Sequence, residues 1–315
     1  MLPITVFDPS IASENLGDEL IMESVEDLLR SVFDTSRLLR VQTHDRIGST
    51  SYDLTNDSSH VFIGGSNLLS SNLLGDQQWR ITLRDSIRVP DSILIGGGWK
   101  QYQNKPSIYS KTLLKQILSS EYTHSVRDSY TKEMLESIGV KNVINTGCPT
   151  LWGIDDDHCK HVPSRKSDDV VFTLTKYSKN KRDKNFIHIL KDKYKTLYFW
   201  PQGFGDYNYL QSLGDTEDII VIGPSVRRYS QFLDSHDVDY VGTRLHGGIH
   251  SIAHQNRTII LGLDNRSVEM GEDFSLPVVR RSDTEAIERK IDTKFELELE
   301  IPRKNIREWK AQFKS

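Results

Sequence analysis

The chain has 315 residues, a formal net charge of -4 and a pI near 6.2. This balance excludes wholesale binding to nucleic acid or to an anionic membrane, since either partner favours a strong basic excess, although a local basic cluster remains compatible with one. Hydrophobic residues make up 37% and charged residues 27% of the chain, which is typical of a soluble globular protein. The length predicts two domains.

Cysteine usage and hydropathy indicate the compartment. Cys148 and Cys159 are the two cysteines, and their spacing fits neither a disulfide framework nor a zinc knuckle. The start, MLPITVFDPS, lacks a basic flank followed by a long apolar run, and no segment approaches the ~20 apolar residues of a membrane span. The predicted localisation is cytoplasmic.

Short apolar runs alternate with helix-like segments from the start, which predicts a mostly parallel α/β sheet with crossover helices. In the first half we expect helices over 20–33 and 130–138, and strands over 4–8, 38–42, 60–65, 92–98, 122–128 and 142–147. Each predicted strand ends in glycine or a polar turn. In open α/β sheets this carboxyl edge is where ligands bind.

The charged stretch 155–169 has no hydrophobic period and is interpreted as a linker. Beyond it we expect a second series, with strands over 170–175, 196–202, 218–223, 239–244 and 258–264 and helices over 184–193, 230–235, 248–256 and 302–314. The basic tract 178–185 is interpreted as a solvated loop. The predicted fold is α/β, with two Rossmann-like doubly wound domains facing a cleft, 1–160 and 161–300, and a C-terminal helix over 301–315.

The motif NLGDE follows the first strand and opens the first helix. Asp18 and Glu19 lie in the predicted first turn, where the helix dipole favours negative charge, so capping explains them without any ligand. The alternative is that Asn15, Asp18 and Glu19 bind ligand hydroxyls at the edge of the sheet. A sugar suits these carboxylates, whereas a phosphate does not.

Two glycine clusters, FIGGSN and LIGGGW, end strands of the first half. Neither matches the G-x-G-x-x-G fingerprint, so a nicotinamide cofactor is not favoured. Paired glycines serve as turns or packing devices, and their N–H groups, if free, also cradle anions or sugar oxygens. The residues predicted to bind substrate in this way are Gly64, Gly65, Ser66, Asn67, Gly97 and Gly98.

Arg127 and Cys148 stand near the ends of the next two strands. A guanidinium at a strand's carboxyl end is costly unless it meets an anion, so Arg127 is either a ligand clamp or part of an internal salt bridge. Cys148, in TGCPTLW, has no obvious local base, which favours a packed small hydrophobe over a nucleophile.

The stretch GTRLHGGIH places Arg244 and His246 where a strand gives way to a helix. His246, His250 and His254 recur every four residues, a spacing that suits a metal. A zinc protease motif, H-E-x-x-H, would need glutamate where this chain has Gly247, so a metal is not predicted. Arg244 and His246 are instead expected at the ligand-binding edge of the sheet.

The order NLGDE, FIGG, GGG, SVRDS, TG-x-P and TRLHG resembles the polysaccharide pyruvyltransferase family, from about Asn15 to about Asp264. The resemblance implies two Rossmann-like domains arranged as in GT-B glycosyltransferases, and transfer of the pyruvate unit of phosphoenolpyruvate to two hydroxyls of one sugar, as a cyclic ketal. The family's arginine-histidine pair falls on Arg244 and His246, and its upstream arginine on Arg127. Many members have aspartate where this chain has Cys148, so that carboxylate's role is not carried over.

The chemistry suits these residues. Phosphoenolpyruvate carries two anionic groups, which arginine binds well, and a histidine is the natural general acid for protonating its methylene carbon. We expect His246 to handle that proton, Arg244 and Arg127 to hold the phosphate, and Asp18 or Glu19 to orient the sugar. The expected partners are phosphoenolpyruvate as donor, with no cofactor, and a sugar or lipid-linked oligosaccharide of an exopolysaccharide or cell-wall glycan as acceptor. Nucleic acid is not expected, whereas peripheral association with membrane-bound glycan machinery is.

Acceptor specificity is assigned to the loops 66–78 and 99–106, with Trp79, Trp99 and Tyr102 as candidates for stacking on sugar rings or, equally, as core or surface residues. Two alternative functions are open. One is a GT-B-type glycosyltransferase that uses a nucleotide sugar, which the same fold would serve. The other is a glycan-binding protein without catalysis.

Overall fold

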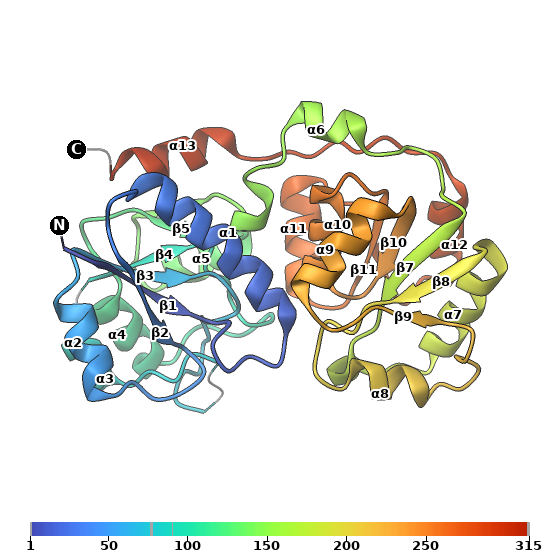
Figure 1. Ribbon diagram of the computed structural model, residues 1–315. Coiled ribbons are helices and arrows are strands. Elements are labelled where there is room, and N and C mark those ends of the chain that lie inside the picture. The colour runs from blue at the N-terminus through green and yellow to red at the C-terminus, as the bar shows by residue number, and fades with distance from the viewer. Residues whose placement is uncertain (1, 76–77, 90, 314–315) are drawn as a thin grey trace. The chain divides into compact units, whose positions relative to one another are not determined.

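The computed structural model describes residues 2–75, 78–89 and 91–313 and divides into two compact units (Figure 1). Unit 1 comprises Met1–Ser13, Ile21–Trp152 and Ile301–Ser315, and unit 2 comprises Glu14–Leu20 and Gly153–Glu300. The C-terminal segment thus groups with unit 1, and the start of the first helix groups with unit 2. Lys314, and residues 76 and 77 of the predicted acceptor loop, lie outside the described residues.

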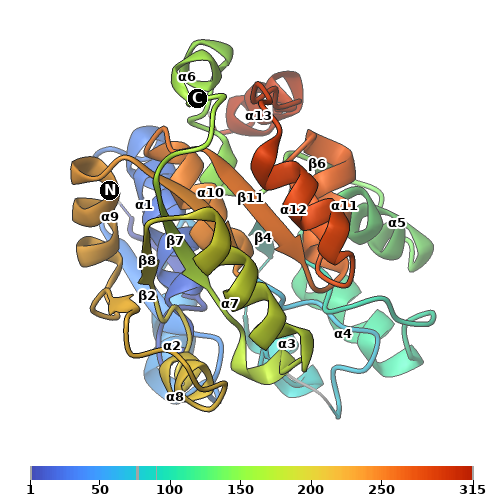
Figure 2. The same cartoon turned by 90° about the vertical axis from the view of Figure 1, so that its right-hand side faces the viewer.

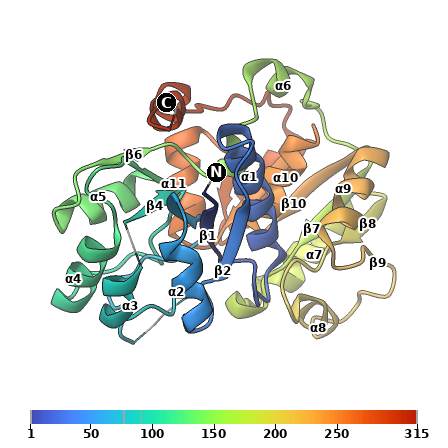
Figure 3. The same cartoon turned by 60° about the vertical axis from the view of Figure 1, so that its left-hand side comes forward.

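Unit 1 is built on parallel strands in the order β2-β1-β3-β4, with β5 and β6 forming a further parallel pair (Figure 3). A parallel bridge from Gly97 to Val126 links the end of β4 to β5. The topological switch point lies between β1 and β3, where the strand order reverses. The strands are β1 (Ile4–Asp8), β2 (Leu38–Gln42), β3 (His60–Gly64), β4 (Ser92–Ile95), β5 (His124–Val126) and β6 (Val143–Asn145).

The helices of unit 1 bury apolar faces against this sheet, and the C-terminal helix joins the same core. Trp309 is 1% exposed and packs edge-on against Phe313 and Trp152, with ring centroids 4.9 and 5.8 Å away. This aromatic packing ties the end of the chain to unit 1. The helices are α1 (Leu16–Val32), whose first turn counts with unit 2, α2 (Ser49–Asn56), α3 (Leu83–Arg88), α4 (Ile108–Ile117), α5 (Ser129–Ser137), the 3-10 turn η1 (Pro149–Leu151) and α13 (Arg303–Ala311).

Unit 2 has one parallel sheet in the order β12-β11-β10-β7-β8-β9, the strand order of a dinucleotide-binding Rossmann fold. The central strand β10 is buried along its whole length, as is usual for parallel sheets covered on both faces. The switch point lies between β7 and β10. The strands are β7 (Asp169–Thr173), β8 (Thr196–Phe199), β9 (Ile220–Val221), β10 (Val238–Gly242), β11 (Thr258–Gly262) and β12 (Val278–Arg280).

Helices cover both faces of the second sheet. Figure 2 shows α7 and α12 on one side and α9 and α10 on the other. The helices are α6 (Asp156–His161), the 3-10 turn η2 (Lys176–Ser178), α7 (Arg182–Lys193), α8 (Asp206–Gln211), α9 (Val226–Ser235), α10 (Leu245–Ala253), α11 (Asn265–Phe274) and α12 (Thr284–Asp292). In the part of the chain that the structure describes, no helix combines the length and apolar character needed to span a membrane.

Two predictions about elements are wrong. The stretch 155–169 is not a plain linker, because it contains α6, whose first turn is capped by the Asp155 carboxylate accepting from the His158 N–H. Six residues are too few to display a hydrophobic period. The strand expected over 92–98 ends at Ile95, because Gly96 takes a left-handed φ of +61° that stops the ladder.

Candidate active site

Arg244 lies at the switch point of unit 2, directly after β10 and before α10. Its backbone is fixed on both sides. Its N–H donates to the Thr173 hydroxyl at 3.1 Å, and its carbonyl accepts from the Tyr240 hydroxyl at 2.7 Å. Tyr240 and Thr173 also bond to each other at 2.7 Å. Two buried hydroxyls on neighbouring strands therefore set where the Arg244 side chain starts.

The guanidinium of Arg244 forms a buried ion pair with Asp206 on the first turn of α8. Its Nε and Nη2 donate to Asp206 Oδ2 at 3.0 and 2.6 Å, and the arginine is only 6% exposed. The same carboxylate accepts from the backbone N–H groups of Gly203 and Lys176 at 2.8 and 2.9 Å. Asp206 therefore joins three segments and neutralises the arginine. No acceptor for the N–H groups of Arg244 Nη1 is found among the described residues. These donors are therefore not used by the described part of the protein.

A tyrosine connects Arg244 to a second arginine. The Tyr177 ring lies 5.1 Å from Arg244 Cζ, in cation–π geometry. Its hydroxyl accepts from Arg266 Nη2 at 3.0 Å. Arg266, in the first turn of α11, is held by Asp264 through Nε at 3.0 Å and Nη2 at 2.6 Å. Because β10 and β11 are neighbours, two guanidinium groups reach the same sheet edge, one over the Tyr177 ring and one at its hydroxyl.

His246 is the second residue of α10 and is 4% exposed. The two glycines after it bring this helix close to the sheet. A Cβ on Gly247 would stand 2.9 Å from Gln202 Oε1, and one on Gly248 would stand 2.9 Å from a Tyr240 ring carbon. Any larger residue would lift α10 away from β10, so the glycines fix the depth at which His246 is held.

The other two histidines of the series have protein partners. His250 Nε2 lies 2.8 Å from the Ser230 hydroxyl, and His254 Nδ1 lies 2.6 Å from Asp234 Oδ1. Burial, and then the neighbouring His254, lower the pKa of His250 to about 3. His250 is therefore neutral at physiological pH and acts as a packed helix residue.

The segment Glu14–Leu20 brings the whole NLGDE motif to the same unit. Asn15 Oδ1 accepts from the Gly17 N–H at 3.2 Å and from Gln202 Nε2 at 2.8 Å, while Asn15 Nδ2 reaches Asp18 Oδ2 at 3.4 Å. Gln202 in turn lies against Gly247. Glu19 is mostly exposed, and its pKa is raised by partial desolvation and then by the charge of Asp18. Asn15 thus lies one side chain, that of Gln202, away from the first turn of α10, and Asp18 is bonded to Asn15.

Arg127 belongs to unit 1 and is 1% exposed. Its Nε pairs with Asp128 Oδ2 at 2.9 Å, and its Nη1 donates to Asn67 Oδ1 at 2.7 Å. A Cβ on Gly98 would stand 2.1 Å from Arg127 Cζ, so the guanidinium lies flat on that glycine. The structure brings Asn67, Gly98 and Arg127 together, and the internal salt bridge considered for Arg127 is present.

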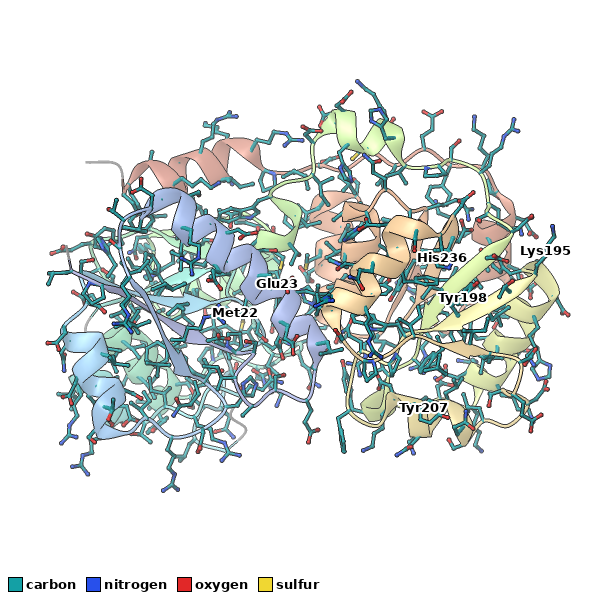
Figure 4. All side chains as sticks on the ribbon, in the orientation of Figure 1. Met22, Glu23, Lys195, Tyr198, Tyr207 and His236 are labelled. Carbon is teal, nitrogen blue, oxygen red and sulfur yellow. The ribbon has the colours of Figure 1, made fainter. Side chains whose placement is uncertain are left out.

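The glycines of the two clusters are engaged in backbone hydrogen bonds and close packing. The idea that their N–H groups are free is wrong for four of them. Gly65, Gly97 and Gly98 donate to the carbonyls of Ile63, Ser125 and Ser66 at 3.2, 3.3 and 2.9 Å, and Gly96 donates to the Ser125 hydroxyl at 2.8 Å. Gly64 and Gly65 also sit beneath α1. Their added Cβ atoms would stand 2.6 Å from Met22 Sδ, on the helix marked in Figure 4, and 2.5 Å from Ile21 Cγ2. Gly65 and Ser66 have left-handed φ angles of +63° and +61°.

Three other candidates are resolved by burial. Trp79 and Trp99 are 1% and 0% exposed, so both are core residues and neither stacks on a sugar. Cys148 is buried, and burial raises the pKa of its thiol, which confirms the packed hydrophobe.

Tyr102 is 56% exposed and borders a groove of about 520 Å³ that is lined by Ser71, Asn72, Tyr102, Gln103 and Asn104.

A family model described as polysaccharide pyruvyl transferase matches residues 15–265. The chain belongs to the polysaccharide pyruvyl transferase family. The resemblance carried by the motifs is therefore confirmed, and the protein is a transferase of that family. No curated protein sequence gives a significant match to this pyruvyl transferase.

Solved structures confirm the fold class of the pyruvyl transferase. It is similar to UDP-GlcNAc 2-epimerase of Methanocaldococcus jannaschii in complex with UDP-GlcNAc and UDP, at 14% identity and a TM-score of 0.55, over 98% of each chain. It is also similar to UDP-GlcNAc 2-epimerase of Neisseria meningitidis bound to UDP-GlcNAc, at 14% identity and a TM-score of 0.50, over 99% of this chain and 100% of the other. At such identity the likeness shows the fold alone, two Rossmann-like units as in GT-B-like proteins.

Sequence reasoning missed four residues at the sheet edge of unit 2 in this pyruvyl transferase. They are Tyr177, Gln202, Asp206 and Arg266. Tyr177, Asp206 and Arg266 follow predicted strands, in TKYS, GFGD and LDNR, and Gln202, in WPQG, is the last residue of the strand predicted over 196–202. Position at or after the end of a strand was therefore the available signal. Local sequence did not say which of these loops meet, because that depends on the strand order. Within the described residues, no group of three or more His, Cys, Asp or Glu is placed to hold a metal ion.

Proposed function

We propose that this pyruvyl transferase moves the pyruvate unit of phosphoenolpyruvate onto two hydroxyls of one sugar, forming a cyclic ketal and releasing phosphate. The observation that carries the proposal is the pairing of Arg244 with His246 at the switch point of unit 2, where α/β sheets bind their ligands. The Nη1 donors of Arg244, which have no described acceptor, suit an anionic substrate. The histidine two residues later suits a substrate that must be protonated.

Phosphoenolpyruvate presents a phosphate and a carboxylate, and we assign these to the two arginines that share Tyr177. Arg244 offers Nη1, and Arg266 offers the guanidinium edge not taken by Asp264. The planar forks bind such groups in bidentate fashion, which lysine does not. Arg127 stays a predicted phosphate ligand, and its contacts in unit 1 support a positioning role for the loops that hold Asn67 and Gly98.

The reaction balances with one proton donor. The π electrons of the enol ether take a proton from His246 at the methylene carbon, and the neighbouring carbon becomes an oxocarbenium centre. A first sugar hydroxyl attacks that carbon and loses its proton, which restores the histidine. The carbon–oxygen bond to phosphate then breaks with its electron pair, and the second hydroxyl closes the ketal while its proton leaves with phosphate. Asp18 or Glu19 is assigned to orient those hydroxyls.

The acceptor sugar is assigned to unit 1. The groove beside Tyr102 lies in the loops predicted to set acceptor specificity, and an exposed aromatic ring among amide and hydroxyl side chains is a typical surface for a saccharide. Asn72 and Asn104 would hydrogen-bond sugar hydroxyls while Tyr102 stacks on the ring. The predicted substrate-binding residues Gly64, Gly65, Ser66, Asn67, Gly97 and Gly98 would support this binding through the loop geometry that they maintain.

The test combines ligand stabilisation with turnover. Phosphoenolpyruvate should raise the melting temperature, because a ligand at about 100 times its Kd stabilises by about 2.7 kcal/mol. His246→Ala and Arg244→Ala should fold but release little phosphate in an acceptor screen, and Arg266→Ala should raise KM for phosphoenolpyruvate. His254→Ala is the matched control, since it removes a histidine bonded only at the surface of the same helix.

Three results would overturn the proposal. Near-normal phosphate release by His246→Ala would remove the histidine from the reaction. Stabilisation by nucleoside diphosphates but not by phosphoenolpyruvate would favour the glycosyltransferase alternative, and glycan binding without any phosphate release would favour the non-catalytic one.

A further inference from the structure

A run of exposed basic side chains precedes and opens helix α7 in unit 2. We call it the basic segment, and its members are Lys176, Lys179, Lys181, Arg182 and Lys184. From the sequence this tract was interpreted as a solvated loop. In the structure Arg182 and Lys184 belong to the first turn of α7, so two of the five basic residues lie on a helix end.

The basic segment differs from the opposite end of the same helix in its ion pairing. Lys191 pairs with Asp218 at 2.7 Å, Lys193 with Asp292 at 2.5 Å, and Lys195, just beyond the helix, with Asp168 at 2.7 Å. No carboxylate of the described chain lies within 4.0 Å of a charged nitrogen in the basic segment. No described carboxylate therefore compensates the positive charge of this end.

The position of these charges is unfavourable for α7 alone. A helix N-terminus carries partial positive charge and favours acidic residues, yet Lys181 is the N-cap and offers no side-chain cap. The one acid of the first turn, Asp183, is 1% exposed and bonded to Arg281 Nε at 3.0 Å and to the Tyr209 hydroxyl at 2.6 Å. It does not offset the exposed cations. An anionic partner outside the protein would remove this conflict.

Exposed aromatic rings border the basic segment. Tyr177, Phe204 and Tyr207 are 66%, 73% and 44% exposed. Lys176 Nζ lies 5.6 Å from the exposed Phe204 ring, and Lys179 Nζ lies 5.4 Å from the ring of Tyr209, a buried residue of α8. Figure 2 shows α8 and the chain leading into α7 at the same end of unit 2, and Figure 4 marks Tyr207 on α8.

We propose that the basic segment and its aromatic border dock this protein on an anionic lipid bilayer. Clustered lysines and arginines bind anionic headgroups, and aromatic rings favour the interface between headgroups and acyl chains. Nucleic acid fits less well, because the chain is acidic overall. In addition, the mostly exposed Phe204 beside the cations would be stabilised more by a bilayer interface than by nucleic acid. The surface would hold the transferase where a lipid-linked acceptor is presented, and its existence does not depend on the proposed reaction.

The test is co-sedimentation of the full chain with vesicles of neutral lipid alone or with 30 mol% anionic lipid, in about 0.05 M and 0.5 M salt. Two triple variants of equal net charge are compared. One carries Lys179→Glu, Lys181→Glu and Lys184→Glu, and the control carries Lys191→Glu, Lys193→Glu and Lys195→Glu. Each basic residue near an anionic surface contributes about fivefold to partitioning, so the first variant should bind at least about 100-fold more weakly than the wild type.

The control variant should bind as the wild type does, because its lysines are already paired. Binding should also fall in high salt, where the Debye length shortens from about 14 to about 4 Å. Acidic residues at the start of α7 suit the helix dipole, so an unchanged urea midpoint is expected for the first variant and separates lost binding from unfolding. Equal vesicle binding by the two triple variants would overturn the inference, as would displacement by duplex DNA at equal phosphate concentration.

Discussion

Replacing Gly203 with alanine tests whether the ion pair between Arg244 and Asp206 positions the candidate active site. A Cβ at this position would stand 2.0 Å from Arg244 Nη2, 2.9 Å from Arg244 Cζ and 3.0 Å from Asp206 Oδ2. The two distances to Arg244 are shorter than real Cβ contacts, and the distance to Asp206 is tighter than most of them. Gly203 does not have a left-handed φ, so the backbone accepts alanine and the whole effect of the methyl falls on the ion pair.

The magnitude follows from how the pair is packed. Breaking a buried ion pair costs about 3–5 kcal/mol, whereas inserting one methyl into a packed site costs about 1–3 kcal/mol. Arg244 is an extended side chain whose Nη1 has no acceptor in the described chain, so it can swing while Nε keeps Asp206. We therefore expect the lower range for the free energy of unfolding. Displacing a substrate-binding group by about 1 Å lowers turnover by about 100-fold.

The assay measures urea unfolding and phosphate release for Gly203→Ala beside Gly153→Ala. Gly153 lies in the same unit, has no heavy atom within 4 Å of its added Cβ, and is not in the left-handed region. The control should be unchanged or slightly more stable. If Gly203→Ala matched the control in both measurements, Asp206 would not be holding Arg244 in place, and the account of this ion pair would be refuted.

Two further predictions concern the surroundings of the same helix. Tyr240→Phe should lower the free energy of unfolding by about 1–3 kcal/mol, because the Arg244 carbonyl and Thr173 hydroxyl lose a buried partner; an unchanged urea midpoint would contradict this. Acidification should destabilise the protein, since His250 has a pKa of about 3 when folded and near 6.5 when unfolded, so the unfolded chain binds more protons between these values. Stability should fall by about 1.4 kcal/mol per pH unit below 6.5, and His250→Gln should lose that part of the slope in urea titrations at pH 7, 6 and 5.

Local sequence determined the elements and the most informative motif. Strands such as Ile4–Asp8 and Val238–Gly242 are short runs of mostly apolar residues, and that pattern depends only on neighbours in the chain. The glycines of GTRLHGGIH marked a strand-to-helix turn for the same reason, so Arg244 and His246 were placed at a ligand-binding edge before any tertiary information. Short elements such as α6 and β12 carried too few residues to show a period.

Tertiary structure decided which side chains meet. Asp206 and Arg244 are far apart in sequence, and they pair because the strand order brings the loops after β8 and β10 to one edge around β7. The same long-range packing buried Trp79 and Trp99, engaged the glycine N–H groups and joined α13 to unit 1. Burial and ion pairing depend on residues distant in the chain, whereas composition and periodicity record only what is near. The sequence therefore identified the arginine and the histidine, and only the fold revealed the aspartate that holds the arginine.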